Sequence, residues 1–117
     1  MILSASYNQT SIEKIKNSFV VNKVKEIVHR YDKEAEIILF GSRARGDWHE
    51  ESDWDFLVLT KKKVTPELEK QIIYDAADVE VKEGICLQFL IKSKKNWEED
   101  YSVTPIFYNI KEEGLQL

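Results

Sequence analysis

The sequence predicts one domain of the α/β (α+β) class, in which helices flank a small mixed β-sheet. Two observations support this prediction. The chain has 117 residues, the usual size of a single domain, so residues 1–117 are expected to fold as one unit. Its apolar positions also form helix-like and strand-like stretches in the order helix, strand, strand, helix, strand, helix, which is typical of a sheet covered by helices.

Three helices are expected from apolar spacing and capping residues. The first spans about residues 11–30, where apolar side chains recur at steps of three and four. The second begins at Thr65-Pro66, because threonine caps a helix and proline suits its first position, and it ends before Gly84. A second Thr-Pro pair starts the third helix, which spans about residues 105–113.

Three short strands are expected, at residues 36–40, 53–59 and 85–91. The first is almost continuously apolar, so both of its faces are expected to be buried. A polar connection joins the first two strands, which favours an antiparallel pair. A helix separates the second strand from the third, which favours a crossover connection.

Composition excludes several classes of protein. The 17 basic and 21 acidic side chains give a net charge of −4, which argues against a nucleic-acid module with a broad basic surface. The single cysteine, Cys86, has no partner for an internal disulfide, which indicates a reducing compartment. Residues 1–7 lack the features of a signal peptide, and no run of about 20 apolar residues could span a membrane. A cytoplasmic protein is therefore expected.

A glycine-rich turn follows the first strand and has the residue types that bind phosphate. Gly41 allows a sharp turn whose amides can form a concavity for an anion, and the Ser42 hydroxyl adds a donor. Arg43 and Arg45 lie in the same turn, and guanidinium groups bind phosphates through paired hydrogen bonds. We expect only one of the two arginines to contact a ligand. Taken alone, the Gly-Ser pair is more often only a turn, and the two arginines are more often surface residues.

Asp53 and Asp55 lie two positions apart at the start of the second strand. The strand repeat places both carboxylates on one face, with Cα atoms about 6.6–6.8 Å apart. Adjacent like charges are unfavourable without a partner, and a divalent cation is the natural one. Mg²⁺ in particular binds one or two protein carboxylates together with substrate phosphates. An isolated Asp-x-Asp pair is more often a solvated edge, but its combination with the preceding turn is specific.

The two segments together, 41–46 (GSRARG) and 52–58 (SDWDFLV), resemble the signature of the nucleotidyltransferase superfamily related to DNA polymerase β. Within it, the chain is most similar to the minimal nucleotidyltransferases. The resemblance implies the nucleotidyltransferase fold and the transfer of a nucleoside monophosphate to an acceptor with release of pyrophosphate. AMP from ATP is the expected donor pair, and another nucleoside triphosphate is the alternative. It assigns nucleotide binding to Gly41, Ser42, Arg43, Arg45 and Gly46, catalysis to Ser42, Asp53 and Asp55, and Mg²⁺ binding to the two aspartates.

One departure from the family pattern leaves two functions open. Active members usually carry a third carboxylate on a neighbouring strand, and residues 85–91 contain none. Gln88 is the polar residue nearest to the expected position, and an amide cannot act as a base. Asp78, Glu80 and Glu83 precede the strand and are weaker candidates. The chain is therefore expected to be a nucleotidyltransferase or, alternatively, a catalytically impaired module that binds nucleotide and a partner.

The resemblance also implies partners. Proteins of this kind often pair with a small helical protein of the HEPN class, as toxin and antitoxin, and the acceptor can be a tyrosine of that partner. A homodimer is a second expectation, because a small domain with an open cleft needs another surface to enclose its substrate. The role of His49, between the two motif segments, stays open.

Overall fold

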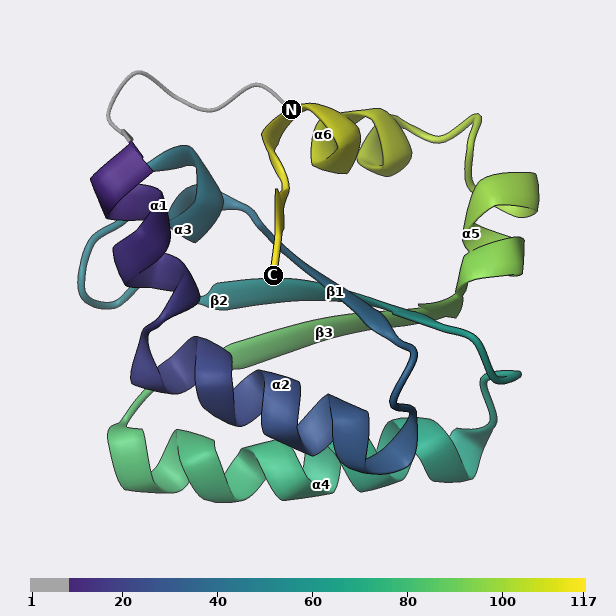
Figure 1. Ribbon diagram of the computed structural model, residues 1–117, viewed down its shortest axis with the longest axis horizontal. Helices are drawn as coiled ribbons and strands as arrows, with labels where there is room; N and C mark the ends of the chain where they lie inside the picture. The colour runs from purple at the N-terminus through teal and green to yellow at the C-terminus, as the bar shows by residue number, and fades with distance from the viewer. Residues whose placement is uncertain (1–8) are drawn as a thin grey trace.

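A four-stranded mixed sheet lies at the centre of the computed structural model, which describes residues 9–117 (Figure 1). Its strands are β1 (Glu36–Phe40), β2 (Trp54–Thr60), β3 (Leu87–Ser93) and β4 (Leu115–Gln116). They lie in the order β3-β2-β1-β4. β1 is antiparallel to both β2 and β4, and β2 is parallel to β3. The predicted antiparallel pair and the predicted crossover are both confirmed.

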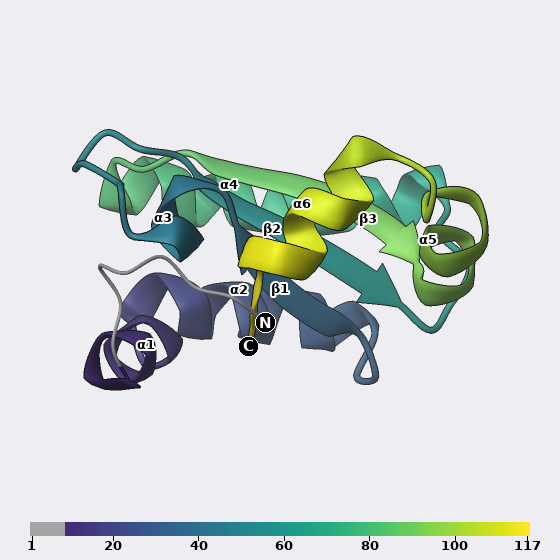
Figure 2. The same cartoon turned by 90° about the horizontal axis from the view of Figure 1, so that it is seen from above.

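Helices cover both faces of this sheet. They are α1 (Gln9–Lys16), α2 (Phe19–Tyr31), α3 (Ser42–Arg45), α4 (Pro66–Glu83), α5 (Lys94–Asp100) and α6 (Pro105–Glu113). The long helices α2 and α4 pack on one face, whereas α5 and α6 lie over the other (Figures 1 and 2). This arrangement is the small mixed sheet flanked by helices that the sequence predicts.

Alternating side chains of the strands divide the apolar core into two parts. On β2, Phe56 and Val58 are fully buried against the α2 and α4 layer. Leu57 and Leu59 point to the opposite face, where they pack with Trp97 of α5 and with Phe107 and Ile110 of α6. The period of two along the strand therefore assigns each residue to its layer, as the sequence indicates.

The first predicted helix is wrong in one respect, because residues 11–30 form two helices and not one. α1 ends at Lys16 and α2 begins at Phe19. Ser18 between them has an extended backbone, and its hydroxyl accepts a hydrogen bond from the Val21 N–H at 3.3 Å. Serine competes for backbone hydrogen bonds in this way at helix starts. The apolar spacing continues across the break and conceals it.

Three further elements, α3, α5 and β4, were not among the predicted helices and strands. α5 begins where the Ser93 side chain accepts a hydrogen bond from the Asn96 N–H, and Trp97 is its buried residue. A single buried side chain gives too little periodicity to identify a helix. β4 is only two residues long, and pairing with β1 defines it.

The predicted starts of α4 and α6 and the predicted end of α4 are confirmed. Thr65 and Thr104 cap α4 and α6 through their side chains, and Gly84 ends α4 in the left-handed conformation, with φ of +64°. No helix in the described part of the chain, residues 9–117, is long and apolar enough to cross a membrane. The expectation that residues 1–7 are no signal peptide lies outside the described residues.

Candidate active site

The glycine-rich turn connects β1 to the short helix α3. Gly41 has a φ of +75°, and a Cβ at this position would collide with the Asp55 carboxylate. Its carbonyl accepts hydrogen bonds from the N–H groups of Ala44 and Arg45, each at 3.0 Å. Gly46 ends α3 in the left-handed conformation, with φ of +94°. Both glycines of the motif are therefore required by the backbone, and the first also allows close approach to Asp55.

The two aspartates lie beside this turn, although only one of them is part of a strand. β2 begins at Trp54, so Asp53 precedes the strand and is exposed, whereas Asp55 is half-buried. Asp55 pairs with Phe40 of β1 on one side and Gln88 of β3 on the other. The motif segments thus meet at one end of the β1–β2 pair, where Asp55 lies against Gly41.

The electrostatics of Asp55 favour a bound cation. Burial raises the pKa of its carboxyl, the negative charges of Asp53 and Glu113 raise it further, and Arg45 opposes them. Within residues 9–117 no group of three or more acidic, histidine or cysteine side chains is arranged to hold a metal ion. Two carboxylates fit Mg²⁺, which completes its coordination with waters and substrate phosphates. Asp53 and Asp55 are the residues that would hold it.

Arg43 contacts the loop that follows the turn. Its side chain is buried, donates hydrogen bonds to the carbonyls of Ser52 and Glu50 at 3.1–3.3 Å, and lies between two indole rings. The guanidinium carbon is 4.4 Å from the Trp48 ring centroid and 4.6 Å from that of Trp54. Arg43 therefore holds the loop against β2 by hydrogen bonds and cation–π contacts.

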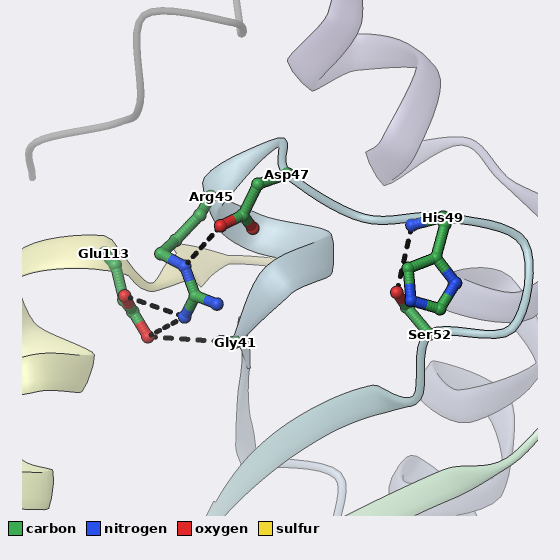
Figure 3. A network of polar contacts seen from close by, with 6 residues as sticks. All are labelled: Gly41, Arg45, Asp47, His49, Ser52 and Glu113. Carbon is green, nitrogen blue, oxygen red and sulfur yellow. Dashed lines mark hydrogen bonds and ion pairs between the residues drawn. The ribbon is translucent and has the colours of Figure 1, made fainter.

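Arg45 points to a different side and is half-exposed. It forms ion pairs with Glu113 at 3.3 Å and with Asp47 at 3.4 Å (Figure 3). Because it lies on the same side as the Gly41 N–H, it is the arginine that fits a phosphate. That only one of the two arginines contacts a ligand stays a prediction, and the structure favours Arg45 for this role.

Glu113 is a site residue that the sequence did not predict. It is the last residue of α6, and its carboxylate accepts hydrogen bonds from the Gly41 N–H and from Nη1 of Arg45, all at 3.3 Å (Figure 3). The sequence signal next to Glu113 is the glycine that follows it, Gly114. A Cβ at Gly114 would lie 2.6 Å from the Ile110 carbonyl and 2.7 Å from Ile38, so only glycine fits there. That close approach brings the end of α6 to β1 and so to the turn.

The residue nearest to the expected position of a third carboxylate is Gln88, whose side chain is an amide. Gln88 pairs with Asp55 across the parallel β2–β3 ladder, and it is exposed. The weaker candidates, Asp78, Glu80 and Glu83, belong to α4. Asp78 forms an ion pair with Lys82, and the Glu80 carboxylate accepts a hydrogen bond from the Leu87 N–H at 3.2 Å.

His49 lies apart from the Arg45–Glu113 group (Figure 3). It is exposed, and its backbone N–H donates to the Ser52 hydroxyl at 3.0 Å. This hydrogen bond closes the loop between the two motif segments. His49 therefore belongs to the loop and not to the Arg45–Glu113 group, and its role stays open.

Comparison with known families identifies the class of protein to which this chain belongs. Residues 21–115 match the sequence model of the family described as "Nucleotidyltransferase domain". The match covers most of the chain, which therefore belongs to the nucleotidyltransferase family. The resemblance noted from the two motif segments is confirmed.

A curated relative narrows the comparison. The chain is 43% identical over 63 residues to a protein of Methanocaldococcus jannaschii named "putative protein adenylyltransferase". The aligned part covers 54% of this chain and 64% of the relative, so it spans less than two thirds of that protein.

A solved structure supports the fold. A chain from a crystal structure of a toxin–antitoxin with AMP-PNP superposes with a TM-score of 0.59 and 19% sequence identity. The superposition covers 81% of this chain and 69% of the other. The likeness confirms the predicted nucleotidyltransferase fold.

Proposed function

We propose that the protein is a Mg²⁺-dependent nucleotidyltransferase that transfers AMP from ATP to a partner protein, as the antitoxin of a toxin–antitoxin pair. The observation that carries this proposal is the close approach of Asp55 to the Gly41 turn. Hydrogen-bond donors suited to a phosphate therefore lie beside a carboxylate that favours a cation. The name of the curated relative supports protein adenylylation. The structural neighbour, a toxin–antitoxin with AMP-PNP, supports a nucleotide and a protein partner.

Each residue of the site has a role that follows from its position. The Gly41 N–H, the Ser42 hydroxyl and the Arg45 guanidinium bind the β- and γ-phosphates. Asp53 and Asp55 would hold the metal ion, which would supply neutralisation of charge on the phosphates. An acceptor hydroxyl forms the new bond to the α-phosphorus, the bond to the bridging oxygen breaks, and pyrophosphate leaves. Positioning and charge neutralisation supply most of the catalysis in such transfers.

Removal of the proton from the acceptor hydroxyl is the step for which the chain is least well equipped. Gln88 occupies the position beside Asp55 and cannot accept a proton. Loss of a general base costs about 10²–10⁴-fold in rate, so we expect a slow enzyme or one completed by its partner. The second candidate function, a nucleotide-binding module that only masks a partner, is favoured by this same residue.

Further proposals concern the partner and the compartment. A small helical protein of the HEPN class is the proposed acceptor, and a second copy of this chain is an alternative surface for closing the cleft. The cytoplasm is the proposed location, because the lone cysteine fits a reducing compartment.

The experiment that tests the function measures transfer of label from α-³²P-ATP. The purified protein is incubated with Mg²⁺ and with the product of the neighbouring gene as acceptor. The Asp53→Asn/Asp55→Asn double variant is expected to lose transfer. Asp78→Asn, which removes an exposed carboxylate on α4, serves as the control and is expected to transfer like wild type. Binding of ATP without transfer, even with the partner present, would instead establish the nucleotide-binding module.

A further inference from the structure

The carboxylate of Glu113 already occupies donors that the site would offer to a phosphate. It accepts hydrogen bonds from the Gly41 N–H and from Arg45 at 3.3 Å. We propose that Glu113 is a residue of the phosphate-binding site that competes with the ligand. A nucleoside triphosphate then binds by displacing the Glu113 carboxylate from these hydrogen-bond donors. The inference rests on the proposed nucleotide site and adds a residue that sets its affinity.

The backbone at Glu113 is firmly fixed. Gly114 packs so closely on Ile38 and Ile110 that it has no room for a side chain. Leu115 is fully buried and pairs with Leu39 of β1. The competition therefore requires only rotation of the Glu113 side chain, which is about one-quarter exposed and has solvent beside it.

Charge gives the direction of the effect. Four negative side chains lie near the turn, Asp47, Asp53, Asp55 and Glu113, and all of them repel a triphosphate. The ion pair with Arg45 is partly exposed, and such pairs are weak. A triphosphate brings more charge to the same donors than one carboxylate does, so it can displace the side chain. Removal of the Glu113 charge is expected to tighten phosphate binding.

The test compares Glu113→Gln with Glu112→Gln by calorimetric titration. Both variants remove one negative charge from the same turn of α6, but Glu112 is exposed. Glutamine keeps the shape of Glu113 and one acceptor oxygen, so the fold should be retained, and thermal unfolding checks this. The ligands are Mg²⁺-ATP and inorganic tripolyphosphate, with adenosine as a ligand that lacks phosphate. Glu113→Gln is expected to bind the two phosphate ligands about three- to tenfold more tightly than wild type.

Adenosine affinity is expected to be unchanged in Glu113→Gln, and Glu112→Gln is expected to match wild type with every ligand. Equal affinity of wild type and Glu113→Gln for tripolyphosphate would overturn the proposal. Weaker binding by Glu113→Gln would also overturn it, because Glu113 would then position Arg45 for the ligand. If Glu113→Gln is unstable, Glu113→Asp keeps the charge but shortens its reach, and it should tighten binding in the same direction.

A parallel assay of AMP transfer separates this proposal from the proposed function. Tighter phosphate binding by Glu113→Gln with no transfer by either protein would support the competition and contradict the activity. Transfer by wild type without a change in phosphate affinity would support the activity and contradict the competition.

Discussion

Two carboxylates lie at opposite ends of the β1–β2 pair, and they have opposite environments. Asp32 precedes β1 and is buried, and its oxygens accept hydrogen bonds from the N–H groups of Glu34, Lys61 and Lys62 at 2.8–3.1 Å. Asp55, near the start of β2, faces the negative charges of Asp53 and Glu113. One carboxylate accepts hydrogen bonds from three backbone N–H groups, whereas the other faces two negative side chains that Arg45 only partly offsets.

The pKa values of the two groups shift in opposite directions for this reason. Burial alone would raise the pKa of Asp32, but its three backbone hydrogen bonds outweigh burial and lower it. Burial also raises the pKa of Asp55, and there the neighbouring negative charges reinforce it, with Arg45 opposing them. A carboxylate held by backbone donors stabilises the fold, whereas one left among other carboxylates reduces stability and is suited to bind a cation.

The largest expected effect comes from Asp55→Asn. We expect AMP transfer to fall by at least about 100-fold, since a group that stabilises charge in the reaction is lost. The same change should raise the melting temperature by about 2–5 °C, because the ionised carboxylate is disfavoured in the folded state. Initial rates and thermal unfolding at pH 7 check both outcomes. A lower melting temperature would mean that Asp55 contributes to the fold as Asp32 does.

The reverse pattern is expected for Asp32→Ala. Loss of the acceptor leaves three backbone N–H groups without their partner, which should lower the free energy of unfolding by about 2–3 kcal/mol. The rate of transfer per folded molecule should not change, because Asp32 lies at the far end of the sheet. Asp32→Asn keeps one acceptor oxygen and should lose less. Denaturant unfolding measures the stability, and a rate defect at low temperature would contradict the assignment.

The pH dependence follows from the sign of each shift. Asp32 has a lowered pKa in the folded state, so its contribution is fully present above the unfolded value of about 3.9 and is lost as the pH falls through the folded value. The stability difference between wild type and Asp32→Ala should therefore be constant near neutral pH and shrink in acid. For Asp55 the sign is opposite, and the gain from Asp55→Asn should appear only above about pH 4. A gain in Asp55→Asn that persists at pH 3 would contradict this account.

The same contrast shows what the sequence could and could not predict. The turn around Gly41 and the pair Asp53 and Asp55 were recognisable because local geometry and chemistry coincide within 15 residues. Glu113 was not, because it reaches the turn through the packing of α6 and β4 on β1, which no short-range pattern encodes. Asp32 escaped notice for the same reason, since its partners at Lys61 and Lys62 are about 30 residues away.

Secondary structure divides along similar lines. Strands β1 and β2 and helices α4 and α6 were predictable, because each has either a clear apolar period or a Thr-Pro start. The break at Ser18 was hidden because the apolar spacing runs through it. β4 is too short to have a period and exists only through its pairing with β1.

The smallest expected effect distinguishes two neighbouring arginines at the active end of the sheet. Arg43→Lys removes the stacked guanidinium between Trp48 and Trp54 and should destabilise the fold by about 1 kcal/mol, with little change in affinity for Mg²⁺-ATP. Arg45→Lys should leave stability nearly unchanged, because its ion pairs are partly exposed, but weaken nucleotide binding severalfold. Thermal unfolding and calorimetric titration of both variants measure the contrast. If Arg43→Lys weakens binding more than Arg45→Lys, the loop and not the Glu113 side of the turn contacts the phosphates.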